Sequence, residues 1–142
     1  MDNNFIAKTS MTIYAKAATV WQALTDPEMV KQYLFGTTVS SDWQKGSSLT
    51  YTGEWEGKPY EDKGTILEII PGKLLKTNYW SMFYGQEDVP ENRRIVTYEL
   101  DEQDDHTTLT LTQENCKTQE EADHSAKNWT QVLTTLKAIL EK

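Results

Sequence analysis

The C-terminal segment Thr118–Lys142 constrains the fold more than any other part of the sequence. Its apolar residues recur in steps of three and four, which places them on one face of an α-helix: Ala122, Ala126, Trp129, Leu133, Leu136 and Leu140. No glycine or proline interrupts the segment, so at ~1.5 Å per residue it predicts a rod of about 36 Å. Thr118 and Glu121 have the spacing of a capping box, in which each side chain binds the other's backbone N–H. Such a long apolar stripe needs a broad apolar surface to pack against.

The residues before this helix predict a β-sheet that supplies the surface. Alternation of apolar and polar residues predicts a first strand over Phe5–Ile13, and about six further strands follow in a meander from Thr37. Between them, Ala15–Thr25 has helical spacing, and Asp26–Glu28 has the residues that start a second short helix. Strands joined by short turns pair with their sequence neighbours. We therefore predict one α+β domain over residues 1–142: a helix-grip fold, in which a curved antiparallel sheet wraps the terminal helix and leaves a cavity between them.

Charge and composition exclude several classes of protein. Fourteen basic against 22 acidic side chains give a net charge of −8, which disfavours binding to nucleic acid or to an anionic membrane. The N-terminal residues Met1–Asn4 are polar, and the sequence has no apolar run of membrane-spanning length, so we expect a cytoplasmic protein without membrane insertion. Cys116 is the only cysteine, and the two histidines are distant from each other. We therefore expect no disulfide, no metal and no cofactor.

The ionisable residues form no catalytic pattern. His106 lies in a predicted acidic turn, and His124 falls roughly opposite the apolar stripe of the terminal helix, so both are interpreted as surface residues. Cys116 has no adjacent histidine or basic cluster that would lower its pKa, which favours a structural thiol. Four acids gather around a predicted hairpin and are interpreted as a solvated edge: Glu54, Glu56, Glu61 and Asp62.

Two further groups leave alternatives open. Arg93 and Arg94 open a predicted strand, and one of them facing inwards could hold an anionic head group of a ligand. An enzyme of the cyclase or hydrolase type would need an ionisable residue inside the cavity. The only candidates besides the tyrosine hydroxyls are Glu68, Glu99 and Glu114.

The aromatic residues are more informative, because the strand faces predict that several of them converge. We expect the ligand-binding residues to be Trp43, Tyr51, Trp55, Tyr79, Phe83, Trp129 and Leu133. The alternative is that these side chains fill the core completely, since large aromatic residues dominate core packing. In a real cavity, tyrosine hydroxyls and tryptophan N–H groups would provide the few polar contacts that orient a ligand.

The segment Val20–Glu28, with the sequence VWQALTDPE, resembles the opening motif of the START-like (SRPBCC) superfamily. Within it, the match is to the AHSA-type branch, which is named for activators of a heat-shock chaperone's ATPase. The resemblance runs from about Phe5 to Glu141. Later motifs are similar in the same order: Ser41–Trp43 with Gly46, Gly64–Pro71, Leu75, Leu109–Thr112 and Asn128–Glu141. Two departures, Ser47 and Asn128, stand where the family often has glycine, and a bulkier residue at either place could narrow the cavity or alter a turn.

The resemblance implies the helix-grip fold and a deep apolar cavity, but no single activity. Members include lipid carriers, aromatic polyketide cyclases and co-chaperone domains, so function has to be argued from the site. We favour non-catalytic binding or carriage of a small apolar or aromatic molecule, because aromatic lining is present and catalytic spacing is absent. A cyclase- or hydrolase-type enzyme is one alternative. The other is a stress-response co-chaperone that binds a heat-shock chaperone ATPase, for which the acidic segment Phe83–Asn92 is the suggestive surface.

Overall fold

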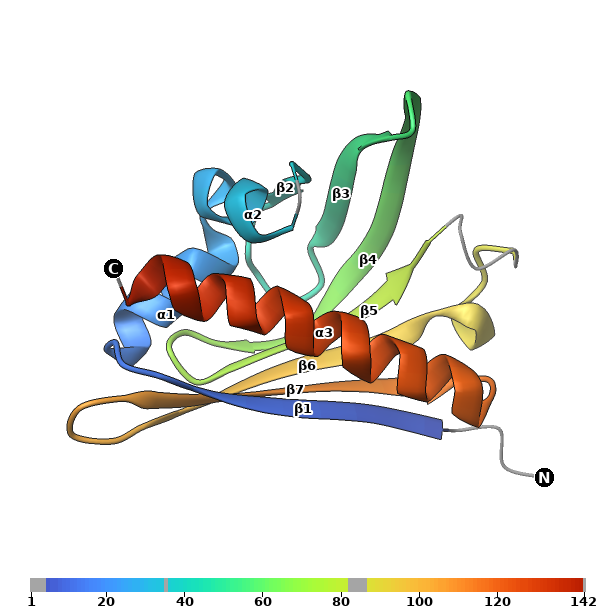
Figure 1. Cartoon of the computed structure of the whole chain (residues 1–142). Helices are drawn as coiled ribbons and strands as arrows, with labels where there is room; N and C mark the ends of the chain where they lie inside the picture. Colours follow the sequence, from blue (N-terminus) through green and yellow to red (C-terminus); the bar gives the residue numbers. More distant parts are fainter. Residues whose placement is uncertain (1–4, 35, 82–86, 142) are drawn as a thin grey trace.

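A seven-stranded antiparallel sheet curves around one long helix, α3 (Figure 1). The computed structural model describes residues 5–34, 36–81 and 87–141, apart from the side chains of Trp55 and Pro90. The elements in chain order are β1 (Phe5–Ile13), α1 (Ala17–Thr25), α2 (Pro27–Tyr33), β2 (Thr38–Ser41), β3 (Ser48–Trp55), β4 (Lys58–Ile70), β5 (Leu74–Trp80), a short 3₁₀ helix (Pro90–Asn92), β6 (Arg94–Glu102), β7 (Thr107–Cys116) and α3 (Gln119–Leu140). The predicted α+β helix-grip fold, with two short helices after the first strand, is confirmed.

The strands lie in the order β1-β7-β6-β5-β4-β3-β2, so all neighbours in the sheet are consecutive in the chain except β1 and β7. The helix α3 packs mainly against β1 and crosses the concave side of the sheet (Figure 1). Polar contacts fix it there: the Thr9 and Thr130 hydroxyls are 2.8 Å apart, and the Lys137 ammonium donates to the Thr12 carbonyl at 2.7 Å. These contacts set the space between β1 and the C-terminal half of α3.

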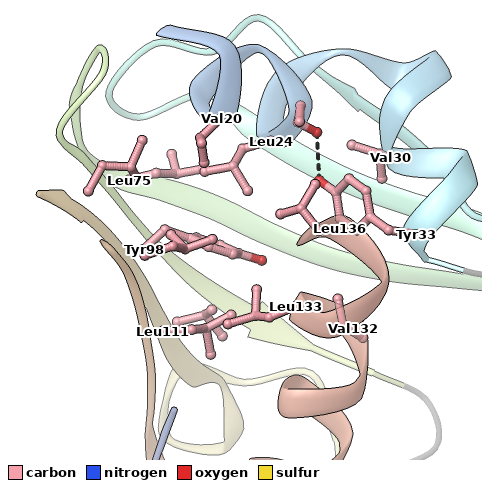
Figure 2. Packing of buried hydrophobic residues seen from close by; sticks show 14 of the residues in the cluster. Val20, Leu24, Val30, Tyr33, Leu75, Tyr98, Leu111, Val132, Leu133 and Leu136 are labelled. Atoms are coloured by element: carbon pink, nitrogen blue, oxygen red, sulfur yellow. Dashed lines mark hydrogen bonds between the residues drawn. The ribbon is translucent and has the colours of Figure 1, made fainter. Parts of the chain in front are cut away.

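The helices α1 and α2 cover one end of this space. Asp26 separates them, and its carboxylate accepts a hydrogen bond from the Glu28 N–H at 3.0 Å, with Pro27 in the first helical position as expected. The Tyr33 hydroxyl donates to the Ala23 carbonyl at 2.7 Å, which ties α2 to α1 (Figure 2). Figure 2 shows the resulting core, in which sheet residues pack against α3 and both short helices. The core residues labelled there are Leu75, Tyr98 and Leu111 of the sheet, Val20 and Leu24 of α1, Val30 and Tyr33 of α2, and Val132, Leu133 and Leu136 of α3.

The start of α3 confirms one half of the predicted capping box and corrects the other. The Thr118 hydroxyl accepts from the Glu121 N–H at 3.0 Å, as expected for an N-cap. The Glu121 carboxylate does not return the bond to Thr118. It accepts from the Lys117 N–H at 3.3 Å and binds Arg94 of β6, because a buried guanidinium is a stronger partner than a backbone N–H.

Strand β4 is longer than the predicted strand Gly64–Ile70, because it begins at Lys58 directly after the turn of Glu56 and Gly57. The polar run with Pro59 is typical of a loop, yet it pairs with β3 over its whole length. The longer strand carries its two-residue period back to Asp62, which shares the buried face with Gly64 and Ile66. The interpretation of Asp62 as part of a solvated edge is therefore wrong.

Gly64 also has a packing role at the β4–β5 pair. A Cβ atom built on Gly64 would lie 2.2 Å from the Asn78 carbonyl oxygen, so only glycine allows the two strands to approach this closely. Elsewhere, no helix in the described part of the chain has the length and apolar character needed to cross a bilayer.

Candidate ligand-binding cavity

A chamber of about 90 Å³ lies between the concave face of the sheet and α3. Four of its nine lining residues are aromatic: Tyr51, Tyr79, Tyr98 and Trp129. Leu34 and Val96 add apolar surface, and Thr37, Asp62 and Thr77 contribute the polar atoms. The chamber therefore has mostly apolar and aromatic walls and few polar groups, the usual composition of a small-molecule site.

A wider cleft of about 540 Å³ adjoins the chamber and opens to solvent beside α3. Most of its polar lining comes from β6, β7 and α3, including Arg94, Gln113, Glu121, His124 and Asn128, and Asp62, Tyr79 and Ser81 complete it. Four residues line both spaces: Leu34, Asp62, Tyr79 and Trp129. These four residues form the neck between chamber and cleft, and a ligand in the chamber would pass them.

Strand alternation places the three tyrosines. Tyr51 on β3, Tyr79 on β5 and Tyr98 on β6 lie on the same face as the buried residues two positions before them, Leu49, Thr77 and Val96. The Tyr51 and Tyr79 rings meet edge to face with centroids 5.9 Å apart, and the Tyr98 and Trp129 rings do so at 6.3 Å. These contacts hold the aromatic walls in fixed orientations.

Trp129 is oriented by a polar network as well as by packing. Its indole N–H donates to the Gln113 side-chain oxygen at 2.8 Å, and the Gln113 amide nitrogen donates to the Ser125 hydroxyl at 3.2 Å. Gln113 is itself only 4% exposed, so this hydrogen-bond network is buried and holds the Trp129 ring in place.

Asp62 is the acidic residue at the neck, and its side chain is 6% exposed. Its Oδ2 atom accepts a hydrogen bond from the Tyr79 hydroxyl, whereas its Oδ1 atom has no donor among the described residues. Burial raises the pKa of Asp62, and the hydrogen bonds from Tyr79 and Ser81 offset only part of that rise. Burial also raises the pKa of Tyr51, and the charge of Asp62 adds to the effect.

Arg94 is the arginine that faces inwards, and it is 2% exposed. Its Nε and Nη2 atoms donate to the two Glu121 oxygens, both at 2.7 Å, and Nη1 donates to the Asn92 carbonyl at 2.6 Å. Arg93 instead binds Asp88 at 2.8 Å and lines neither the chamber nor the cleft. Because Glu121 occupies the guanidinium fork, the site provides no simple anchor for an anionic head group.

The predicted ligand-binding residues divide into three groups. Tyr51, Tyr79 and Trp129 line the chamber. Trp43 and Leu133 belong to the core around it and line neither the chamber nor the cleft, Leu133 being 1% exposed. The Trp55 side chain and Phe83 lie outside the described residues.

Six of the nine residues that line the chamber are not among the predicted ligand-binding residues: Leu34, Thr37, Asp62, Thr77, Val96 and Tyr98. Tyr98 was placed on the correct strand, and its alternation with Val96 already indicated the inner face. Asp62 lies before the first residue of the predicted strand Gly64–Ile70, although its alternation with Gly64 and Ile66 is visible in the sequence.

The three glutamates considered for catalysis line neither space. Glu68 lies 3.6 Å from the ammonium of Lys45 at the surface, Glu99 is exposed, and Glu114 alternates with the inward-facing Gln113. Strand parity therefore directs Glu99 and Glu114 to the convex face. Among the described residues, no group of histidine, cysteine and acidic side chains could hold a metal ion.

The histidines and the cysteine also lie apart from the chamber. The His106 ring is 2.7 Å from the neighbouring Asp105 carboxylate, and His124 is an exposed residue at the edge of the wide cleft. Cys116 is fully buried, and burial is the largest cause of its raised pKa. A thiol in this environment is poorly reactive.

Comparison with known proteins agrees with this architecture. The model of a family described as activator of Hsp90 ATPase homolog 1-like protein matches residues 14–141. The solution structure of ChR145 from Cytophaga hutchinsonii is 43% identical over 99% of this chain and 97% of that chain, with a TM-score of 0.86. The Aha1 dimer from Colwellia psychrerythraea is 20% identical over 96% of both chains, with a TM-score of 0.74.

A third similar structure is DynU16, a putative protein in the dynemicin biosynthetic locus. It is 20% identical over 100% of this chain and 48% of that chain, with a TM-score of 0.79. At this identity, the last two structures show a shared fold only. No curated protein matches the chain.

Proposed function

We propose that this chain, which belongs to the family of activator of Hsp90 ATPase homolog 1-like proteins, binds a small apolar or aromatic molecule without transforming it. The binding site is the chamber between sheet and α3 together with its neck. The observation that carries the proposal is an aromatic-walled chamber that shares four lining residues with a cleft open to solvent.

The two volumes limit the size of the ligand. At about 90 Å³ the chamber is smaller than an engineered cavity of ~150 Å³ that holds benzene. A ligand with its apolar end in the chamber therefore extends through the neck into the cleft of about 540 Å³. The two spaces together fall in the range of ~300–1,000 Å³ typical of small-molecule sites.

The polar groups of the site favour binding over catalysis. General acid–base chemistry usually employs two ionisable groups that flank the reacting atoms. Among the described residues, Asp62 is the only acid that lines the chamber. In the cleft, Arg94 and Glu121 neutralise each other, and His124 is an exposed residue of α3. Recovery of a bound compound in chemically altered form would contradict this part of the proposal.

The direct test is the binding of Nile red, a neutral dye whose fluorescence reports an apolar environment. We expect saturable binding, where micromolar affinity corresponds to about −8 kcal/mol. Thr77→Leu places extra apolar volume in the chamber, because Thr77 is 3% exposed and lines it. This variant should weaken dye binding by about tenfold, since close-packed sites tolerate added volume poorly.

The matched control is Thr97→Leu on β6, where the neighbours Val96 and Tyr98 are buried and Thr97 faces the other side of the sheet. Its dye affinity should equal that of the unmodified protein. Absence of dye binding, together with no shift of the melting temperature by a panel of lipids and aromatic compounds, would mean that the chamber is a packing gap.

A second candidate function, binding to a heat-shock chaperone ATPase, is favoured only by the family's description. The exposed large apolar residues among those described are Ile6 on β1, Tyr14 directly after β1 and Ile70 at the end of β4. Single exposed apolar residues are ordinary on a protein surface. Stimulation of a chaperone's ATP hydrolysis by this chain, unaffected by Thr77→Leu, would place this candidate first.

A further inference from the structure

The Oδ1 atom of Asp62 is a buried acceptor without a donor. The side chain is 6% exposed, lines both the chamber and the cleft, and satisfies Oδ2 through Tyr79, while no described residue donates to Oδ1. A buried oxygen of a charged group is costly when it lacks a hydrogen-bond partner, and it calls for an explanation even though Tyr79 and Ser81 bind the same carboxylate. Here the free lone pairs lie at the neck, where a ligand would pass.

Asp62 also has no counter-ion in the part of the chain that the structure describes, since none of the ion pairs there includes it. Two basic residues line the adjoining cleft. Arg94 gives two donors to Glu121 and a third to the Asn92 carbonyl, and His124 forms no ion pair with Asp62. The neck therefore presents a negative charge that no ion pair among the described residues neutralises.

We infer that the site selects ligands in which a protonated amine is joined to a small apolar group, with the ammonium N–H donating to Asp62 Oδ1 and the apolar group in the chamber. This inference rests on the proposed function and names the class of ligand. It is independent of the fold's family, because it follows from one side chain and its surroundings.

Three kinds of ligand group could contact Asp62: a carboxylate, a hydroxyl or an ammonium group. The surroundings of Asp62 favour the ammonium group. A carboxylate ligand would bring a second negative charge beside a buried one. A hydroxyl group would supply a donor but leave the charge uncompensated. An ammonium group supplies both, and aromatic rings such as those of Tyr51, Tyr98 and Trp129 attract cations through their π-faces. The net charge of −8 also raises the concentration of cations near the molecule.

The test compares three probes of nearly equal size, each with a branched alkyl group small enough for the chamber: 3-methylbutylamine, 3-methylbutan-1-ol and 3-methylbutanoate. Their affinities are measured at pH 7.5 by NMR titration, with the Trp129 indole N–H as the reporter inside the chamber. We expect the amine to bind at least about tenfold more tightly than the alcohol, the effect of one charge-assisted hydrogen bond. The carboxylate should bind most weakly.

Two variants of neighbouring residues on β4 complete the design. Asp62→Asn keeps the shape and removes the charge, so the amine should lose its advantage over the alcohol while Nile red still binds. Glu61→Gln removes the charge of the exposed residue that precedes Asp62 and should leave the order of the three probe affinities unchanged. Because Glu61 points away from the chamber, this control separates local contact from the overall charge of the protein.

The outcomes separate the inference from the proposed function. If Nile red binds but the three probes bind equally, or the carboxylate binds best, the inference is overturned and the binding site stands. If neither the dye nor any probe binds, the proposed function falls as well. Should Asp62→Asn fail to fold, the order of the three probes on the unmodified protein decides the question.

Discussion

Replacement of Glu121 by glutamine tests the ion pair that joins α3 to the sheet. Arg94 is 2% exposed and would keep its charge, but lose the carboxylate that binds it through two contacts of 2.7 Å. Removing one partner of a fully buried pair costs about 3–5 kcal/mol. The Glu121 side chain is 25% exposed and the cleft is open, so water replaces part of the lost interaction and we expect a loss of about 2–3 kcal/mol.

The stabilisation by the Arg94–Glu121 pair should decrease as the pH falls. Burial pushes the pKa of Glu121 upwards, but the hydrogen bonds and charge of Arg94 outweigh it, so the pKa lies below the ordinary value of 4.5. The unfolded state therefore binds the proton more readily than the folded state does. The stabilisation is complete above pH 4.5 and is lost as the pH falls through the lowered pKa. Glutamine does not titrate, so the difference between the two proteins should shrink on acidification.

Urea unfolding at pH 7 and in steps down to pH 3 measures both effects. For a domain of 142 residues, the loss at pH 7 corresponds to a fall in melting temperature of roughly 6–12 °C. Glu120→Gln, on the exposed side of the same helical turn, should change stability by less than about 0.5 kcal/mol. A loss below about 1 kcal/mol at pH 7, or a loss that is the same at pH 7 and pH 3, would refute the reasoning.

Three further predictions concern the ends and edges of elements. Thr118→Ala removes the cap of α3 and should cost about 1 kcal/mol in urea unfolding, whereas no loss would place the energetic start of the helix elsewhere. Gly64→Ala brings a Cβ atom within 2.2 Å of the Asn78 carbonyl, so β4 and β5 must separate at a cost of at least about 2 kcal/mol; an unchanged melting temperature would contradict this close approach. Cys116 should react with iodoacetamide at pH 8 at least about 100-fold more slowly in the native protein than in urea, because it is fully buried and its pKa is raised, and equal rates would show that it is accessible.

The fold could be predicted because its signals are local. The stripe of α3, the alternation along Val96, Tyr98 and Leu100, and the start signal at Asp26–Glu28 each depend on residues within a few positions of one another. Short connections then left few ways to order the strands.

The site was predicted in part, since its most distinctive members depend on contacts between distant residues. Glu121 has the spacing of a capping-box residue. Its carboxylate instead binds Arg94, which lies 27 residues earlier on β6 and cannot be related to Glu121 by sequence spacing. Asp62 lies in a charged run after Pro59, which favours the prediction of a turn. Its burial follows from pairing with β3, and a period of two extended through Gly64 would have indicated it.

The pairing of β1 with β7 has a consequence for how the chain folds. Phe5 lies opposite Cys116 and Ile13 opposite Thr107, so the first strand gains its partner only when nearly the whole chain is available. Contacts of such large sequence separation slow folding, because the intervening chain must be ordered before they form. During synthesis from the N-terminus, β1 therefore remains unpaired until β7 follows the meander of β2 to β6. The helix α3, which follows β7, then packs against β1. Until β7 has been synthesised, β1 and β6 each keep an open strand edge, and the unpaired N–H and C=O groups of such edges favour aggregation.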